Sequence, residues 1–489
     1  MGNHESIDLN ALAVAEMKQQ GFEPAFPPPV MKEIGNLPET ILDQKGLTDL
    51  RALLWSSIDN VDSQDLDQLE YCEQLSNGHI LVRVAISDVD LLVPQNSATD
   101  RHAAHNGTSV YTGVETFPML PDRLAKGLTS LLPEKDHRVV VIEYTILDDG
   151  VIKHGGIYPA LARNHAKLVY EDVGSWLEGL SPLPEMVNNV PLLEEQLHLQ
   201  YEAALRLRTY RMDRGALDLE TSEPQVIMEA GEIRDIIEQK ENAARRLIEE
   251  FMIAANVTIA KYLDSAGRPM IERVVRVPKY WDAIVETAAS FGEKLPIQPD
   301  PKALSEFLTR RKEADPGHFQ DLSLTIVKLL GAAEYLPLYP EEVPFGHFGL
   351  AIPDYTHGTA PNRRYVDIII QRLIKATIRE EKNPYTREEL VERSKWLTDR
   401  DKAAKKVERF MRKAAAAVLL GDRTGETFEG FVTGVTRHGT FARIIDPPAE
   451  GKVVQGEKGL RVGNKVVLRL LKTDPYQGYI DLACIKKRA

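Results

Sequence analysis

The sequence predicts an α+β fold with a short helical N-terminal segment, one large mixed domain and a small C-terminal all-β domain. Two observations support this prediction. Helical and strand patterns mix irregularly through the middle of the chain, and only short strands with glycine bends follow residue 423. At about 100 to 200 residues per domain, 489 residues suggest two to four domains. We place the divisions at residues 1–44, 45–422 and 423–489.

The N-terminal segment is predicted to contain two short helices. Asp8 can cap a helix from Leu9 to Gln20, which Gly21 ends. A proline-rich connector follows, and residues 30–37 can form the second helix. We expect this segment to pack on the large domain.

The large domain is predicted to combine strands with amphipathic helices. Residues 80–86 and 138–147 have strand character, residues 241–263 predict a long helix, and residues 387–420 predict helices rich in Lys, Arg and Ala. The buried face of the helix over 241–263 is predicted from its apolar spacing to be Leu247, Ile248, Phe251, Met252, Ala255 and Ile259.

The C-terminal domain is basic, whereas the rest of the chain is acidic. Residues 423–489 hold twelve Lys and Arg against seven Asp and Glu, a net of +5 in a chain whose total charge is −13. Strand patterns occupy residues 427–435, 439–444, 465–470 and 479–482. A basic module of this kind suits a polyanionic partner.

Four aspartates lie within nine residues: Asp59, Asp62, Asp65 and Asp67. Like charges at this spacing repel, and hard carboxylate oxygens suit Mg²⁺ or Mn²⁺. An EF-hand loop is excluded, because Val61 and Gln64 occupy positions that require an oxygen ligand and a glycine. A solvated acidic turn is the alternative interpretation.

A second polar cluster lies in residues 347–365. Pro361 and the apolar run after residue 367 indicate that Arg363 and Arg364 open a helix. Guanidinium groups at a helix start can bind phosphate together with free backbone N–H groups. An exposed, solvated arginine pair is the alternative.

Together these clusters resemble the aspartate motif and the HFGLA…YTHFTSPIRRYPD motif of the RNase II family, which shares the RNB domain. Further stretches match the family in the same order: Val110–Tyr111 ahead of Pro118–Pro121, Ala166–Tyr170, Gly215–Asp218 and Ile248–Asn256. The resemblance covers residues 45–489 and ends in an S1 domain, a five-stranded OB-fold barrel. It implies a hydrolytic 3′→5′ exoribonuclease that degrades single-stranded RNA to nucleoside 5′-monophosphates with Mg²⁺ or Mn²⁺.

The resemblance assigns the metal site to Asp59, Asp65, Asp67 and Gln68. Asp67 takes the position of the carboxylate on which catalysis depends most, and Asp65 is assigned to catalysis beside it. Gln68 departs from the family, which has a fourth aspartate there. A neutral amide lowers the charge of the site and should weaken metal binding, so we expect assistance by at least one metal ion rather than a secure two-metal site.

The resemblance also assigns contacts with RNA. Arg363 matches the arginine that contacts the scissile phosphate, and Arg364 serves structure or a neighbouring phosphate. Tyr111 matches the tyrosine that packs against the 3′-terminal nucleotide and sets where degradation stops, and Leu219 replaces its usual aromatic partner. Two further departures, Gly358 for phenylalanine and Asn362 for isoleucine, either open the cavity floor or change how the last nucleotides are held.

The remaining RNA contacts implied by the resemblance are Tyr170 and Glu249 at the ribose 2′-OH, Glu408 near the active site, and Phe431, His438 and Phe441 on the stacking face of the S1 domain. A solvated or salt-bridged carboxylate is the alternative role for Glu249 and Glu408. The alternative for the two phenylalanines is to fill the barrel.

Composition suggests a cytoplasmic protein. Only Cys72 and Cys484 are present, too few for a disulfide framework, and no apolar run approaches the ~18 residues that cross a bilayer. We expect a monomer that binds single-stranded RNA, with no membrane or obligate protein partner. The family's cold-shock OB domains do not fit in residues 1–44, so a more open entrance for RNA is expected. The alternative function is an RNB-like, catalytically weakened RNA-binding regulator.

Overall fold

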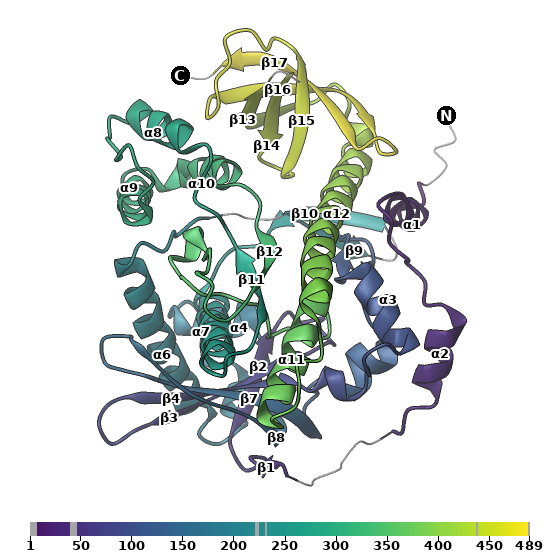
Figure 1. Ribbon diagram of the computed structural model, residues 1–489. Helices are drawn as coiled ribbons and strands as arrows, with labels where there is room; N and C mark the ends of the chain where they lie inside the picture. Colours follow the sequence, from purple (N-terminus) through teal and green to yellow (C-terminus); the bar gives the residue numbers. More distant parts are fainter. Residues whose placement is uncertain (1–6, 40–45, 221–223, 230–231, 437–438, 488–489) are drawn as a thin grey trace.

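The computed structural model describes residues 7–39, 46–220, 224–229, 232–436 and 439–487 (Figure 1). Its large domain is built on a sheet with the strand order β1-β8-β2-β3-β4-β7. Strand β8 (Ile152–Val169) also pairs with β7 (Asp136–Ile146), so one long strand joins both sides of the sheet. The other strands are β1 (Thr48–Asp49), β2 (Trp55–Asp59), β3 (Gln68–Gln74) and β4 (Ile80–Ser87). The strands predicted at 80–86 and 138–147 are confirmed as β4 and β7.

Helices cover this sheet and form one apolar core with it. The core includes residues of α6 (Leu193–Asp213), α7 (Ala243–Ser265) and α11 (Tyr365–Ile378). Helix α7 confirms the prediction over 241–263, and five of the six residues predicted on its inner face are buried. Met252 is only partly buried, because it faces a cavity.

Helix α12 (Arg387–Leu419) is one continuous helix of 33 residues, where the sequence predicted several. A capping box between Thr386 and Glu389 starts it, and its alanine-rich end has no residue that breaks a helix. In Figure 1 it runs from the lower part of the large domain to the barrel at the top.

The smaller elements complete the large domain. They are α3 (Ala98–Asn106), β5 (Val110–Tyr111), β6 (Thr116–Phe117), α4 (Tyr170–Leu177), α5 (Glu185–Asn188), β9 (Pro224–Glu229), β10 (Glu232–Glu238), β11 (Met270–Val274), α8 (Trp281–Ser290), α9 (Pro301–Ala314), α10 (Pro316–Leu330) and β12 (Glu334–Leu338). Helices α8, α9 and α10 share a separate small apolar core at the upper left of Figure 1.

Both predicted N-terminal helices are confirmed. Helix α1 (Leu9–Gln19) is capped by Asp8, whose side chain accepts a hydrogen bond from the backbone N of Ala11 at 2.9 Å. Helix α2 (Pro28–Gly35) begins two residues earlier than predicted, because proline is well suited to the first turn. The two helices lie beside α12 and α3, on the right of Figure 1, as the packing prediction required.

The C-terminal domain is a closed barrel of five strands in the order β13-β14-β15-β17-β16. The strands are β13 (Thr427–Thr436), β14 (Gly439–Ile444), β15 (Ala449–Gln455), β16 (Lys465–Asp474) and β17 (Tyr479–Lys487). The sequence patterns missed β15. Its Gly451 has no room for a side chain, since an added Cβ would lie 2.6 Å from the carbonyl oxygen of Ile480.

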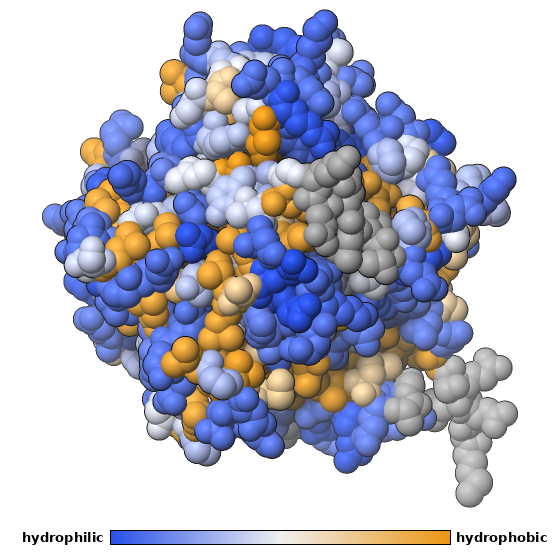
Figure 2. Space-filling model, turned by 90° about the horizontal axis from the view of Figure 1, so that it is seen from below, coloured by the Kyte–Doolittle hydropathy of each residue, from blue (hydrophilic) through white to orange (hydrophobic). Residues whose placement is uncertain are grey.

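The surface seen from below is mainly hydrophilic, with apolar residues in several separate patches (Figure 2). Among the described residues, no helix combines the length and the apolar character needed to cross a membrane.

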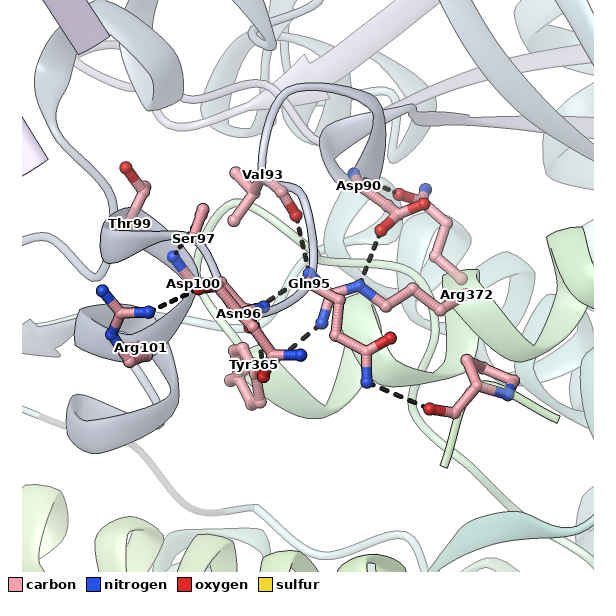
Figure 3. A network of polar contacts seen from close by, with 12 residues as sticks. Asp90, Val93, Gln95, Asn96, Ser97, Thr99, Asp100, Arg101, Tyr365 and Arg372 are labelled. Carbon is pink, nitrogen blue, oxygen red and sulfur yellow. Dashed lines mark hydrogen bonds and ion pairs between the residues drawn. The ribbon is translucent and has the colours of Figure 1, made fainter. Parts of the chain in front are cut away.

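A buried polar network anchors α11, the helix that follows Arg363 and Arg364 (Figure 3). Arg372 contacts Asp90 at 2.6 Å and Asp100 at 2.8 Å, and donates a hydrogen bond to the carbonyl oxygen of Val93. The hydroxyl of Tyr365 donates to Asp100 as well. The first residue and the middle of α11 are therefore tied to the segment between β4 and β5.

Replacing Arg372 with Met should destabilise the protein strongly. The side chain of Arg372 is 4% exposed, so the substitution leaves the buried Asp100 without this cation, at a cost of about 3–5 kcal/mol in the free energy of unfolding. Urea denaturation measures the loss. The matched control is Arg310→Met, whose arginine is half exposed and pairs with Glu293, and which should cost less than about 1 kcal/mol. Equal losses would contradict the anchoring role.

Candidate active site

The aspartate loop is held at one edge of the sheet. Asp59 ends β2, which runs parallel to β8 with Asp59 opposite Val169, so Tyr170 at the start of α4 comes close to the loop. Asp59 Oδ1 accepts hydrogen bonds from the backbone N of Asn60 and from Ser63 Oγ, both at 2.7 Å. Asp67, just before β3, is 3% exposed. Of the four aspartates, only Asp62 is exposed, as the alternative of a solvated turn requires.

Lys167 fixes the tip of this loop, a role that the sequence patterns did not reveal. Its Nζ donates to the carbonyl oxygen of Val61 at 3.2 Å and to that of Ser63. Lys167 lies on β8, distant in sequence from the aspartates, and only the parallel pairing of β2 with β8 brings it near. A positively charged side chain, that of Lys167, therefore lies beside the aspartate loop.

Arg363 reaches Asp67 from a distant part of the chain. Its Nε lies 3.8 Å from Asp67 Oδ2, and its side chain is 44% exposed and lines the cavity. Arg364 instead forms a two-point contact with Asp367 at 2.8 Å and does not line this cavity. The two arginines lie just before α11, as predicted.

The expected free N–H groups beside these arginines are already used, which corrects that part of the prediction. The N–H of Asn362 donates to Asp67 Oδ1 at 2.9 Å, and those of Arg363 and Arg364 donate to Ala360. The N–H of Tyr365 donates to Gly107. Phosphate can therefore be bound here by the guanidinium of Arg363 rather than by this stretch of backbone.

One cavity of about 330 Å³ gathers most of the predicted site. The predicted residues that line it are Asp59, Asp65, Asp67, Gln68, Tyr111, Tyr170 and Arg363. Asn60, Ser63, Arg245, Ile248, Met252, Thr359 and Ala360 complete the lining. Carboxylates, two arginines and two tyrosines thus face a single space.

A neighbouring cavity of about 420 Å³ contains Leu219 and Glu249. Tyr170, Arg245 and Ile248 line both cavities, so the two spaces adjoin. Leu219, the expected partner of Tyr111, lines this second cavity and not the first.

The other predicted RNA contacts lie outside these two cavities. Glu408 on α12 accepts a hydrogen bond from the backbone N of Tyr111 at 3.2 Å, so it contacts the backbone of the tyrosine. Phe431 and Phe441 are partly exposed and are absent from the buried core of the barrel. His438 lies outside the described residues.

Arg245 is a further member of the site that the motifs did not identify. Its guanidinium stacks 4.4 Å from the ring centre of Tyr170 and donates to Asn60 Oδ1 at 3.2 Å and to Glu171 at 2.6 Å. It lies four residues before Glu249, one turn away on the same face of α7. That helical spacing is the signal that could have found it.

Burial dominates the electrostatics of the carboxylates. Burial raises the pKa of Asp67 to about 7, against the opposing effects of Arg363 and the N–H of Asn362. Burial and the charge of Asp59 raise the pKa of Asp65. Glu70, two residues after Gln68 on β3, is fully buried, and burial raises its pKa well above the ordinary value.

The donor set fits a divalent cation held in an open site. Among the described residues, no three His, Cys, Asp or Glu side chains converge closely enough to enclose a metal ion. Mg²⁺ is usually bound through one or two carboxylates, with water and substrate phosphate in the other positions. The hard oxygens of Asp59, Asp65, Asp67 and Gln68 around one cavity suit that arrangement.

The two departures in the arginine motif do not enlarge the cavity. A Cβ on Gly358 would lie 2.7 Å from Ile259 Cδ1 and 3.1 Å from Ile370 Cγ2, so apolar core already fills this space. Asn362 is 1% exposed, and its side chain accepts a hydrogen bond from Thr129 Oγ1 at 2.6 Å. Of the two alternatives for these departures, packing around Gly358 therefore disfavours an opened cavity floor.

Comparison with known proteins identifies the family. The RNB domain model matches residues 47–380, and a model of the RNase II-type exonuclease C-terminal S1 domain matches residues 426–484. The chain belongs to the RNB family, the class of protein that the fold and the site define.

Among the relatives are proteins named Ribonuclease R. That of Thermotoga maritima is 31% identical over 99% of this chain and 71% of its own length, and that of Escherichia coli is 31% identical over 93% and 56%. The chain thus spans just over half of the E. coli relative.

Solved structures share the fold. Mycoplasma genitalium RNase R in complex with ribose-methylated single-stranded RNA has a TM-score of 0.87 at 24% identity, covering 98% of this chain and 78% of that chain. Yeast Ssd1, a pseudonuclease, has a TM-score of 0.73 at 16% identity, covering 95% and 58%. The family resemblance and the S1 barrel are confirmed.

Asp67→Asn should stabilise the metal-free protein increasingly as pH rises. The folded-state pKa of about 7 exceeds that of the unfolded chain, so the contribution of this carboxyl to stability is fully present below about pH 4 and is lost up to about pH 7 as the buried group ionises. Asn has no charge to bury, and the difference should approach about 4 kcal/mol at most above pH 7. Denaturation with a chelator from pH 4 to 8 measures it. A difference that does not change with pH would contradict the burial of Asp67.

Proposed function

We propose that this chain is a hydrolytic 3′→5′ exoribonuclease that degrades single-stranded RNA to nucleoside 5′-monophosphates. The observation that carries the proposal is the meeting of Arg363 with the aspartates of a distant loop in one cavity, between Tyr111 and Tyr170. A cation beside carboxylates in a partly enclosed space is suited to a phosphodiester. The sequence relatives named Ribonuclease R support the same activity.

The proposed chemistry divides the work between the carboxylates and the arginine. Asp59, Asp65, Asp67 and Gln68 would hold Mg²⁺ or Mn²⁺, which when bound supplies charge to the phosphate and acidity to an attacking water. Arg363 contacts the scissile phosphate and stabilises the negative charge that builds on its oxygens. Its position beside Asp67 keeps the guanidinium in the cavity before RNA arrives.

The neighbouring residues are proposed to select and hold RNA. Tyr111 packs against the 3′-terminal nucleotide, while Tyr170 and Glu249 contact the ribose 2′-OH, the group that distinguishes RNA from DNA. Glu249 is exposed and lines the second cavity, and desolvation by the surrounding protein raises its pKa. Leu219 borders the second cavity, which adjoins the first.

The S1 barrel is proposed to collect single-stranded RNA through Phe431 and Phe441. In the strand register Phe431 lies opposite Arg443, and Phe441 lies two residues before Arg443 on the same strand, so all three share one face. Arg443 is buried and paired with Glu238, but the exposed Lys465 lies opposite Phe431 and the exposed Lys452 lies opposite Phe441, so the face combines stacking surfaces with positive charge. The buried core of the barrel does not include either ring, which supports an RNA-binding role over a filling role.

The proposal keeps the divisions at residues 1–44, 45–422 and 423–489 and describes a cytoplasmic monomer. Two unpaired cysteines, Cys72 and Cys484, are consistent with a reducing compartment.

A catalytically weakened RNA-binding regulator is the other candidate, and the fold alone does not exclude it, because yeast Ssd1 shares the fold. The assay that separates the two uses 5′-labelled oligoribonucleotide with Mg²⁺ or Mn²⁺. Progressive shortening from the 3′ end is expected. A retarded RNA band without cleavage would identify a regulator.

Asp67→Asn should lower the rate of hydrolysis by orders of magnitude while RNA affinity is retained or increased, because the substitution keeps the shape and removes the charge. Single-turnover cleavage and filter binding on the same RNA measure both quantities. Asp62→Asn, in the exposed part of the loop, is the control and should change little. Full activity of Asp67→Asn would overturn the site.

Gln68→Asp should lower the Mg²⁺ concentration that gives half of the maximal rate, because it adds a carboxylate to the cavity. Titration of the rate with Mg²⁺ measures the change. An unchanged or higher requirement would show that the local geometry is built around the amide.

Phe431→Ala and Phe441→Ala should weaken RNA binding by about 1–3 kcal/mol each without changing the salt dependence, because stacking releases no counterions. Removal of a positive charge should instead change the salt dependence. Lys452 lies opposite Phe441 in the barrel, and Lys452→Gln should make the dependence of log K on log salt shallower. Binding isotherms at several salt concentrations test both. Unchanged affinity in both phenylalanine variants would exclude the stacking face.

A further inference from the structure

Helix α1 shares an apolar cluster with the β5–β6 hairpin, which carries Tyr111. Leu9, Ala13 and Met17 of α1 belong to one apolar cluster with Val110 of β5 and Phe117 of β6. The same cluster includes Val407, Met411 and neighbouring residues of α12. The hairpin therefore lies against α12, on which α1 also packs, and the three elements share one apolar cluster.

Two adjacent residues of β5 connect the apolar cluster with the catalytic cavity. Successive side chains of a strand point to opposite faces. Val110 is completely buried in the apolar cluster, and Tyr111, the next residue, lines the catalytic cavity. A shift of Val110 thus displaces Tyr111.

The turn after α1 is hydrogen-bonded to α3, the helix that precedes the β5–β6 hairpin. The Asn106 side chain at the end of α3 accepts a hydrogen bond from the backbone N of Glu23 at 3.0 Å and donates one to the carbonyl oxygen of Glu23 at 2.9 Å. Arg400 of α12 donates to the carbonyl oxygens of Gln20 and Gly21, both at 3.1 Å. The N-terminal segment, α3 and α12 are therefore fixed to one another.

The connection from α3 to Tyr111 has little freedom. Gly107 has φ 72°, and a Cβ there would lie 2.9 Å from the Arg400 side chain. The carbonyl oxygen of Gly107 accepts a hydrogen bond from Tyr365, and the backbone N of Ser109 donates to the carbonyl oxygen of Arg363, both at 2.9 Å. The segment that carries Tyr111 is thus joined by its backbone to the segment that carries Arg363.

We propose that residues 7–23, which comprise α1 and the turn after it, are a positioning element for the Tyr111 hairpin and set the length of the shortest RNA that the enzyme retains. This inference rests on the proposed function, in which Tyr111 holds the 3′-terminal nucleotide. A displaced tyrosine holds a short RNA less well, so the RNA dissociates after fewer cleavages. Weaker packing behind the hairpin should therefore lengthen the final product.

The test compares Met17→Ala with Ile34→Ala. Met17 and Ile34 are 1% and 3% exposed and belong to the same N-terminal segment. Met17 packs in the cluster with Val110, whereas Ile34 packs in the main core, which includes neither Val110 nor Phe117. Both variants lose a large buried side chain, and only one loses it behind the hairpin. Tyr111→Ala is the reference for a lost clamp.

Two measurements are made at a temperature at which circular dichroism shows every variant folded. Digestion of 5′-labelled single-stranded RNA gives the length of the final product, and hydrogen exchange gives the protection of the amides of residues 108–117. Met17→Ala should lengthen the final product toward that of Tyr111→Ala and lower the protection of these amides. Ile34→Ala should match the wild type in both.

The outcomes separate the inference from the proposed function. If Tyr111→Ala lengthens the product and Met17→Ala behaves like Ile34→Ala, the positioning role is overturned. Equal lengthening in Met17→Ala and Ile34→Ala would also overturn it, since general destabilisation would then be the cause. If Tyr111→Ala leaves the product length unchanged, the proposed function of Tyr111 fails, and the inference that rests on it fails as well.

Discussion

The burial of several carboxylates around one cavity is the constraint on which the rest of the structure depends. Asp59, Asp65 and Asp67 face one cavity, and Asp67 is almost completely buried. Such an arrangement is unfavourable unless cations are brought near it. Lys167 arrives through the pairing of β2 with β8, and Arg363 arrives through the anchoring of α11. The pairing of β2 with β8 and the anchoring of α11 thus bring two cations from distant segments to one loop.

Local patterns in the sequence were sufficient for most of the elements and for the chemical nature of the site. Periodicity predicted β4, β7 and α7, and the Asp8 cap predicted the start of α1. The spacing of the aspartates indicated hard oxygen ligands before any contact was known. These features depend on neighbouring residues, which is why a single sequence shows them.

What the sequence could not predict depends on contacts between distant segments. In the sequence, Lys167 and Arg245 resemble other lysines on strands and other arginines on helices. Lys167 comes near the aspartates because β8 pairs with β2, and Arg245 joins the site because it stacks on Tyr170. Strand β15 was missed because Gly451 is required by the close approach of the Ile480 backbone, not by a local pattern. In the same way, the room expected at Gly358 is taken by Ile259 and Ile370.

Helix α12 has a mechanical consequence. At 1.5 Å per residue, its 33 residues form a rod about 50 Å long. Its end, from Ala415 to Leu420, is part of the barrel core, and Glu408 on the same rod touches the backbone of Tyr111. Glu408 and Ala415 are about 10 Å apart along α12, so one rigid helix sets the separation between the barrel and the tyrosine. Under the proposed function, an RNA strand must exceed one minimum length to touch both, and a shorter strand touches either the barrel or the catalytic cavity.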